Sequence, residues 1–176
     1  MAKVTGILCQ MITGNVNNAG TDGRVYLGLG GREFRLDSSQ DDYERGSWRE
    51  YVLGRGPVEP NLPPPQIRVT NPTENDPRNG FPIDTAKLSR TPVYIRFEPE
   101  GDSPNWNLKL AIVLVYSGEG QFEVAYFPPS DFDNLWLGDP YGKILYLTEE
   151  WWRDGEFPLR MGREIAAQVS EAVRGA

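Results

Sequence analysis

Short apolar segments with a period of two recur along most of the chain. Successive side chains of a strand point to opposite faces, so this alternation predicts β-strands with one buried face. The segments are rich in Val, Ile, Tyr and Phe and are separated by turn residues such as Gly30-Gly31. We predict strands over residues 4–12, 24–29, 32–36, 48–53, 66–69, 92–98, 107–117, 121–127 and 143–148.

In the fourth and the seventh of these segments the alternation is not strict, and both faces of the seventh are apolar. Residues 110–115 read LAIVLV without a polar interruption. A strand that is buried on both faces is typical of the centre of a sheet. Nine short strands at this spacing predict an all-β fold, an antiparallel β-sandwich, in preference to a barrel or a βαβ unit.

Two insertions and a C-terminal extension accompany the predicted sandwich of residues 1–152. Residues 55–92 hold nine of the fifteen prolines, which give no backbone donor to a sheet, so a long insertion is expected there. A second insertion is expected at about 119–141. Residues 153–176 form an extension, with a helix at about 161–174 that packs on the sandwich or, as an alternative, makes an oligomer contact. Its apolar positions have helical spacing: Met161, Ile165, Val169, Ala172 and Val173.

Charge and composition exclude several classes of function. With 18 Lys and Arg against 25 Asp and Glu, the formal net charge is −7, which argues against binding to nucleic acid. Histidine is absent, so histidine-based catalysis and histidine metal sites are excluded, and any metal must be held by oxygen. The only cysteine, Cys9, cannot form an internal disulfide. No apolar run is long enough to span a bilayer and no secretory signal is evident, so we expect an intracellular, cytoplasmic chain.

Acidic residues concentrate in two loops that each precede a strand. The first covers residues 17–23, NNAGTDG, and the second covers residues 37–46, DSSQDDYERG. Ca²⁺ takes about six to eight oxygen ligands, which acidic loops with small residues supply as carboxylates and backbone carbonyls. The spacing does not match an EF-hand. On these residues alone, a metal site and a solvated acidic turn both remain open.

Three motifs resemble those of the PLAT/LH2 domain (polycystin-1, lipoxygenase, alpha-toxin). They are AGTDGRVYL at 19–27, LDS and DYERGS at 36–38 and 42–47, and GDSPNWNL at 101–108, which is similar to the third loop and Pro-x-Trp-x-Leu strand entry of that family. The resemblance covers roughly residues 3–152 and implies a sandwich of two four-stranded sheets. It also implies a non-catalytic module that, in many members, binds Ca²⁺ at one end and recruits its host to membranes or to a protein.

The resemblance implies two neighbouring calcium sites. The first would use the Asn18 side chain, the Gly20 carbonyl, the Asp102 carboxylate and the Ser103 carbonyl. The second would use the Thr21 carbonyl, Asp37, the carbonyls of Ser38 and Gln40, and Asp42. We rank the second site above the first, because Asn18 stands where some calcium-binding members have an acid.

Several nearby residues have a structural alternative to a functional role. For Asp22 we favour closing the turn before the strand at 24 over ligating a metal. Glu44 and Arg45 are expected to order their loop through ion pairs. Trp48 and Trp106 are candidates for membrane contact, although a tryptophan at a strand entry more often packs on the core.

Catalysis is the least favoured function. The best constellation is Asp37 with Asp42 as acid and base, or Ser38 or Ser39 as a nucleophile, and nothing supplies a base for serine. We therefore expect a non-enzymatic, calcium-binding module that associates with a membrane lipid surface or a protein in a calcium-dependent way. The alternative is a calcium-independent protein-interaction or assembly domain that uses the insertions and the C-terminal helix.

Overall fold

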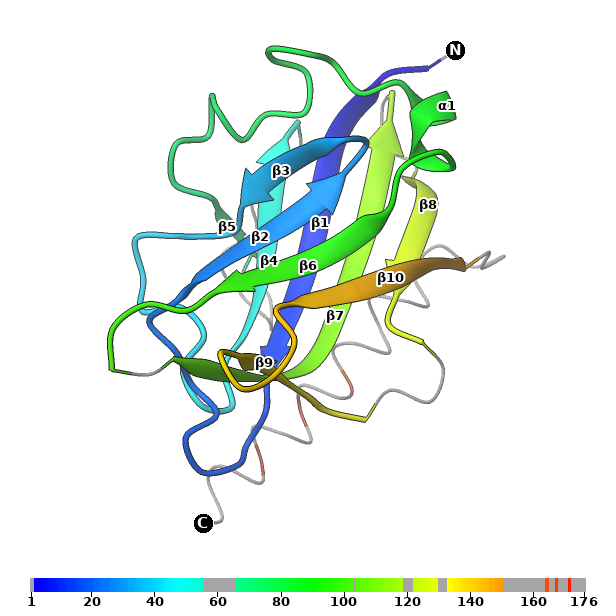
Figure 1. Cartoon of the computed structure of the whole chain (residues 1–176). Helices are drawn as coiled ribbons and strands as arrows, with labels where there is room; N and C mark the ends of the chain where they lie inside the picture. Colours follow the sequence, from blue (N-terminus) through cyan, green and yellow to red (C-terminus); the bar gives the residue numbers. More distant parts are fainter. Residues whose placement is uncertain are drawn as a thin grey trace.

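The computed structural model describes residues 2–55, 66–102, 104–118, 122–129 and 133–150, together with Glu164, Ala167 and Glu171. The regular secondary structure of the described residues is almost entirely β-strand (Figure 1). Every one of the nine predicted strands is present, with ends shifted by one or two residues. The strands are β1 (Val4–Thr13), β2 (Arg24–Leu29), β3 (Arg32–Arg35), β4 (Trp48–Gly54), β5 (Gln66–Arg68), β6 (Val93–Glu98), β7 (Asn105–Ser117), β8 (Phe122–Phe127), β9 (Leu135–Gly138) and β10 (Ile144–Glu150).

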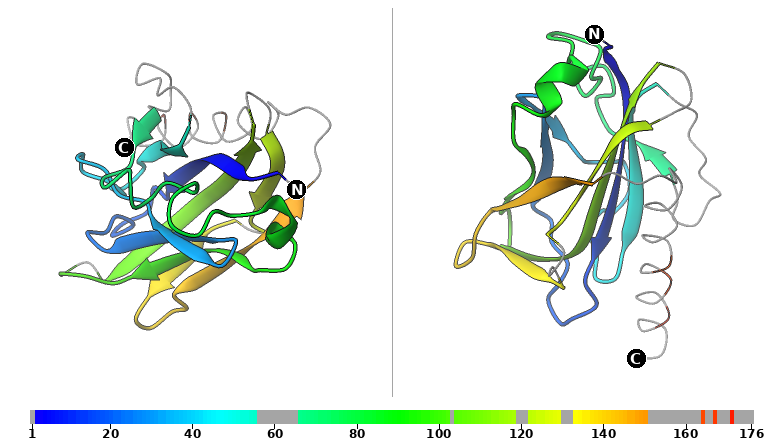
Figure 2. Two further views of the ribbon diagram at one scale, coloured as in Figure 1. Left: turned by 90° about the horizontal axis from the view of Figure 1, so that it is seen from above. Right: turned by 90° about the vertical axis from the view of Figure 1, so that its right-hand side faces the viewer.

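The strands form two facing layers that are joined through β10. One hydrogen-bonded path runs β3-β2-β6-β10-β8-β7-β1-β4-β5, with β9 paired to β7. The first half of β10, residues 144–147, pairs with β6, and residues 148–150 pair with β8. The edge-on view in Figure 2 shows β10 passing from one layer to the other. The prediction of two separate four-stranded sheets is therefore corrected to one curled sheet that is folded into two layers.

One strand pair departs from the predicted antiparallel arrangement. Strand β5 lies parallel to β4, with Tyr51 opposite Ile67. A parallel pair needs a connection that returns the chain to the starting end of the sheet, which usually takes a dozen or more residues. Residues 55–65 connect β4 to β5, which is close to this length.

The space between the two layers is filled by apolar side chains from both. Strand β2 contributes Leu27, β6 contributes Phe97, and β1 contributes Ile7, each at most 1% exposed. Alternate residues of each strand point into this core, as the period of two predicts. The core therefore holds the layers together through burial of apolar area.

Strand β7 confirms the prediction of a central strand with two buried faces. It lies between β1 and β8, and its residues Ala111, Val113 and Val115 belong to the inner core. Its intervening residues point to the opposite face, where they join a second buried cluster. We call this cluster the outer apolar face; its members are Leu8, Ile12, Val52, Leu110, Ile112, Leu114, Ala125 and Phe127.

Arg32 of β3 bonds to many backbone carbonyls of the proline-rich insertion. The Arg32 guanidinium donates hydrogen bonds to the carbonyls of Glu74, Asp76, Pro77, Asn79 and Phe81, at 2.9 to 3.5 Å. Carbonyls that have no strand partner are satisfied in this way, which is how an irregular segment can lie against a sheet. The insertion ends in a short helix, α1 (Thr85–Leu88), that was not predicted.

Helix content is small in the described part of the chain. No helix among the described residues has the length and apolarity that crossing a membrane requires. The helix predicted at about 161–174 lies outside the described residues except for Glu164, Ala167 and Glu171, which have helical conformation and are exposed. These three residues alone do not establish a packed helix.

Substitution of Gly23 by alanine will destabilise the sandwich. Gly23 directly precedes β2, and the chain there lies close to β6. A Cβ at this position would lie 2.4 Å from the Phe97 ring and 2.8 Å from the carbonyl oxygen of Glu98. Phe97 is fully buried and cannot move aside. We expect a loss of about 1–3 kcal/mol in the free energy of unfolding, measured by urea denaturation. The matched control is Gly142→Ala, where no atom lies within 4 Å of the added methyl group. Equal stability of the two variants would contradict the prediction.

Candidate metal centre

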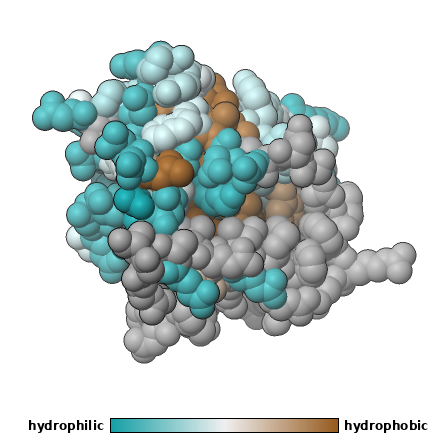
Figure 3. Space-filling model, turned by 90° about the horizontal axis from the view of Figure 1, so that it is seen from below, coloured by the Kyte–Doolittle hydropathy of each residue, from teal (hydrophilic) through white to brown (hydrophobic). Residues whose placement is uncertain are grey.

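Three loops meet at one end of the molecule. They are the β1–β2 loop (14–23), the β3–β4 loop (36–47) and the β6–β7 loop (99–104), described except for residue 103. The Gly46 amide donates to the Gly14 carbonyl at 3.0 Å, and the Thr21 amide donates to the Tyr43 carbonyl at 3.3 Å. Seen from this end, the described surface is mostly hydrophilic with small apolar areas between (Figure 3). The predicted convergence of these loops is therefore observed.

Trp106 lies beneath all three loops and is fully buried. Its indole donates to the Thr13 hydroxyl at 3.0 Å, at the end of β1. Its ring packs edge-on against Tyr43, with centroids 5.1 Å apart, and against Phe97 at 5.9 Å. The prediction that Trp106 contacts a membrane is contradicted by this burial, because a side chain with no exposed surface cannot reach a lipid. The core alternative is the one observed.

Tyr43 fixes the course of the β3–β4 loop. Its backbone has φ +62°, which non-glycine residues adopt only when their surroundings hold them there. The ring is 5% exposed and stacks on Tyr51 at 5.8 Å, and its hydroxyl donates to the Leu36 carbonyl. Burial raises the pKa of Tyr43 well above the usual value, so the phenol stays neutral. With the ring held inside, Asp41 and Glu44 are exposed, whereas Asp42 is turned toward Ser38.

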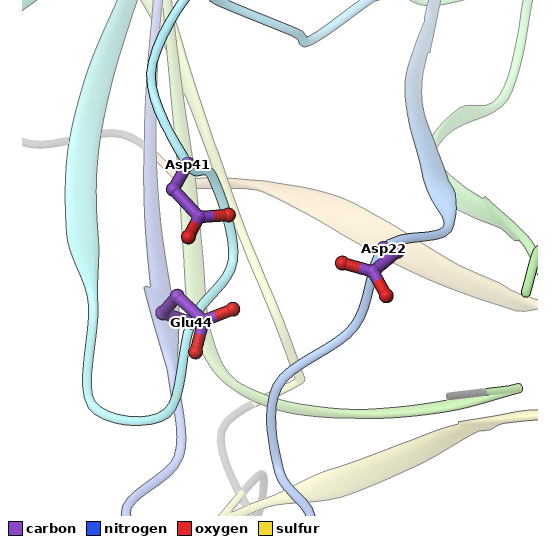
Figure 4. Close-up of side chains that lie close together, drawn as sticks. All are labelled: Asp22, Asp41 and Glu44. Carbon is purple, nitrogen blue, oxygen red and sulfur yellow. The ribbon is translucent and has the colours of Figure 1, made fainter. Parts of the chain in front are cut away.

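Three carboxylates face one another across two of these loops. Asp22 comes from the β1–β2 loop, and Asp41 and Glu44 come from the β3–β4 loop (Figure 4). One carboxylate oxygen of each lies within 4.8 Å of the others, and all three residues are exposed. We call Asp22, Asp41 and Glu44 the acidic triad.

The acidic triad fits a hard divalent cation. Ca²⁺–oxygen distances are about 2.3–2.6 Å, so two oxygens that share an ion lie at most about 5 Å apart. The 4.8 Å limit satisfies this condition. The β6–β7 loop is close to the same point, since a Cβ on Gly101 would lie 4.0 Å from Oδ2 of Asp22. The donors are all oxygen, as the absence of histidine requires.

Neighbouring side chains tie the two acidic loops together. Arg45 donates to the side-chain oxygens of Asn15 at 2.7 Å and Asn17 at 3.3 Å. Gly20 lies against the opposite loop, where a Cβ would come within 3.0 Å of the Arg45 amide nitrogen. The expected ordering role of Arg45 thus involves asparagine partners. These contacts keep Asp22 and Glu44 on facing segments.

In the predicted second calcium site, both aspartates accept hydrogen bonds from other groups of the protein. The Asp42 carboxylate accepts from the Ser38 amide at 2.6 Å and from the Ser38 hydroxyl at 2.9 Å, and its side chain is 6% exposed. Burial raises the pKa of Asp42, and the bonds from Ser38 oppose that shift. The Asp37 carboxylate accepts from the Thr70 hydroxyl at 2.9 Å.

The remaining predicted ligands are dispersed around the acidic triad. Thr21 is buried and Gln40 is exposed, with the Gln40 amide donating to the Ser38 hydroxyl. In the predicted first site, Asn18 and Asp102 are exposed and Gly20 is partly buried, while Ser103 lies outside the described residues. Their roles as ligands stay predictions.

The residues of the acidic triad lie outside the ligand sets of both predicted calcium sites. The turn role that was predicted for Asp22 is filled by Thr21, whose hydroxyl accepts from the Gly23 amide at 3.0 Å. Asp41 and Asp42 are adjacent, and the sequence gives no sign of which one faces outward. In the structure, the positive φ and the buried ring of Tyr43 fix which of the two faces outward.

Two exposed apolar residues lie at the same end of the molecule. Val16 in the β1–β2 loop is 43% exposed, and Tyr141 in the β9–β10 turn is 49% exposed. Tyr141 stacks on Trp136 with centroids 6.1 Å apart. Trp48, the other residue predicted to contact a membrane, begins β4 directly after the β3–β4 loop and is partly buried against the outer apolar face.

Removal of the Tyr43 hydroxyl will weaken the loop that carries Asp41 and Glu44. Tyr43→Phe keeps the ring contacts and leaves the Leu36 carbonyl without this donor. We expect the free energy of unfolding to fall by about 1–3 kcal/mol in urea denaturation. Tyr141→Phe, which removes a hydroxyl from a half-exposed ring, should change it by less than about 0.5 kcal/mol. A Tyr43→Phe variant as stable as the control would exclude this role.

Comparison with known proteins identifies the fold. No family model and no curated protein matches the chain. Among solved structures, alpha toxin from Clostridium absonum matches with a TM-score of 0.51 and 18% identity over 84% of this chain and 32% of the toxin chain.

Two lipoxygenase (LOX) structures also match, with lower scores. One has a TM-score of 0.48 and 15% identity, and the match covers 82% of this chain and 16% of the LOX chain. The other is a complex with arachidonate; it has a TM-score of 0.44 and 14% identity, and the match covers 90% of this chain and 19% of the LOX chain. The chain thus spans about a third of the toxin chain and less than a fifth of each LOX chain. The chain has the all-β PLAT/LH2 fold that its motifs predict.

Proposed function

We propose that the chain is a non-catalytic PLAT/LH2-type module that binds Ca²⁺ at the acidic triad and then associates with an anionic membrane surface. The observation that carries the proposal is the approach of Asp22, Asp41 and Glu44 to within 4.8 Å of one another. The ligands come from two loops that are separate in sequence, so an ion bound there would cross-link them.

Charge links ion binding to membrane association. The chain has a formal net charge of −7, and an anionic lipid surface repels a negatively charged tip. A divalent ion at the acidic triad would supply positive charge at the tip of the loops. Val16 and Tyr141 are exposed apolar groups at this end, and they would then approach the lipid.

The contacts of the best catalytic candidates support a module without chemistry of its own. The Ser38 hydroxyl is bonded to Asp42, and Asp42 is nearly buried. Asp37 is bonded to Thr70 and lies 3.3 Å from the Arg35 guanidinium. These groups brace the β3–β4 loop, which is a structural role.

Calcium binding will depend on the acidic triad. We expect calorimetric titration of chelator-treated protein to give a dissociation constant of about 10⁻⁴–10⁻³ M, the range of weak calcium modules. Calcium at 100 times that constant should stabilise the fold by about 2.7 kcal/mol, seen as a rise in Tm. Asp41→Asn/Glu44→Gln should abolish both effects because it removes two of the three carboxylates.

The matched control removes two exposed charges elsewhere. Glu74→Gln/Glu149→Gln changes the net charge equally and should bind calcium as the wild type does. Loss of binding in this control would show a general charge effect and would refute a site at the acidic triad. Loss of binding in Asp37→Asn/Asp42→Asn, with Asp41→Asn/Glu44→Gln unaffected, would instead favour the predicted second site.

Membrane binding will require both calcium and the apolar tip. We expect sedimentation with phosphatidylserine-containing vesicles to increase with calcium and to fall several-fold in Tyr141→Ser. Phe81→Ser is the control, because Phe81 is 87% exposed but lies near Ile83, which pairs with the start of β1 at the opposite end. Calcium binding without vesicle binding would redirect the search to a protein partner. Equal vesicle binding with and without calcium would exclude the proposed switch.

A further inference from the structure

The outer apolar face is buried, yet all of its members come from one layer. None of its eight side chains is more than 7% exposed, and they belong to β1, β4, β7 and β8 only. Side chains on one face of a sheet stand side by side, so the face cannot cover itself and requires another layer. No second layer contributes to this cluster among the described residues.

Polar groups on the same face are also arranged for burial. Glu50 and Gln10 are fully buried and lie opposite each other on β4 and β1. The Glu50 carboxylate accepts from the amide of Gln10 at 3.0 Å and from the amide of Gln66 at 2.8 Å. A buried carboxylate needs such donors, whereas a solvated one does not. The face is therefore built to be covered.

We propose that the C-terminal segment of the same chain, residues 153–176, covers the outer apolar face. The last described strand, β10, ends beside the outer apolar face. At the end of β10, Thr148 and Glu150 pair with Phe127 and Ala125 of β8, and both β8 residues belong to the face. The segment therefore begins at the border of the surface that it would cover.

The described residues of the segment show which side of it faces water. Glu164, Ala167 and Glu171 have helical conformation and are exposed. Their spacings of three and four place them on one side of a helix. At 100° per residue, Ile165, Val169 and Val173 lie on the opposite side, and Met161 and Ala172 lie at its border. This apolar stripe matches an apolar sheet face in chemistry.

Docking of the segment would limit which other proteins the chain can bind. While the segment is docked, the face on β1, β4, β7 and β8 is unavailable to other proteins, and its release would expose a large apolar surface. The proposal is independent of calcium, because the outer apolar face and the acidic triad share no residue.

Photo-crosslinking of the full chain identifies the occupant. Trp48 and Tyr116 are aromatic, partly buried and packed against the face, so each accepts p-benzoylphenylalanine with little change in shape. After irradiation, we expect the cross-linked peptide, mapped by mass spectrometry, to lie within 153–176 of the same chain. The same label at Tyr146, 59% exposed on β10, should not link to this segment. A link to residues 56–65, or between chains, would overturn the proposal.

A pair of lysine variants tests the orientation of the segment. Val169→Lys places a charge in the apolar stripe, and Ala167→Lys places the same charge on the exposed side. We expect Val169→Lys to lower Tm by at least about 5 °C and to increase binding of an apolar dye, with Ala167→Lys unchanged. Equal behaviour of the two variants would contradict the proposed docking. If the wild type is a dimer and Val169→Lys is a monomer, the segment is exchanged between two copies of the chain. That result would also overturn the proposed docking within one chain.

Discussion

The burial of Trp106 is the constraint on which the functional end of the molecule depends. Its ring contacts Phe97 before one loop and Tyr43 within another, and its indole bonds to Thr13 before the third. Burial of a large aromatic ring is worth about 3–5 kcal/mol, whereas two exposed like charges about 4 Å apart repel by about 1 kcal/mol in water. The aromatic core is therefore strong enough to hold mutually repelling carboxylates side by side. The acidic triad is placed by apolar packing, and its charge is the unfavourable part of the arrangement.

Positive backbone angles determine which acids face outward. Tyr43 at φ +62° turns its ring into the core, so Asp41 and Glu44 point to solvent while Asp42 points back to Ser38. The sequence predicted correctly that these loops converge, because the motifs and their spacing carry that information. It did not predict the triad, because the direction of a side chain in a loop depends on a local dihedral angle that composition and spacing do not encode. The same limit applies to Asp22, whose expected turn bond is made by Thr21.

The strands were predicted well because alternation is a local signal, and their pairing was predicted less well because it is not. The unbroken apolar run of β7 identified a central strand with two buried faces. The passage of β10 between layers depends on its pairing with β6 at one end and β8 at the other, which are remote in sequence. The parallel pairing of β5 depends on the path of a long connection. Neither feature leaves a periodic trace in the chain.

The layer that contains β1, β4, β7 and β8 uses its two faces for different purposes. Its inner face packs on the opposite layer and fixes Trp106 and Tyr51 beneath the acidic loops. Its outer face is equally apolar, and it surrounds a carboxylate that is held by two glutamine side chains. A two-layer sandwich in water needs only one apolar face per layer. The second face on this layer is therefore in excess of what the sandwich itself requires, and it is best explained by a third layer that adds stability to the strands supporting the acidic loops.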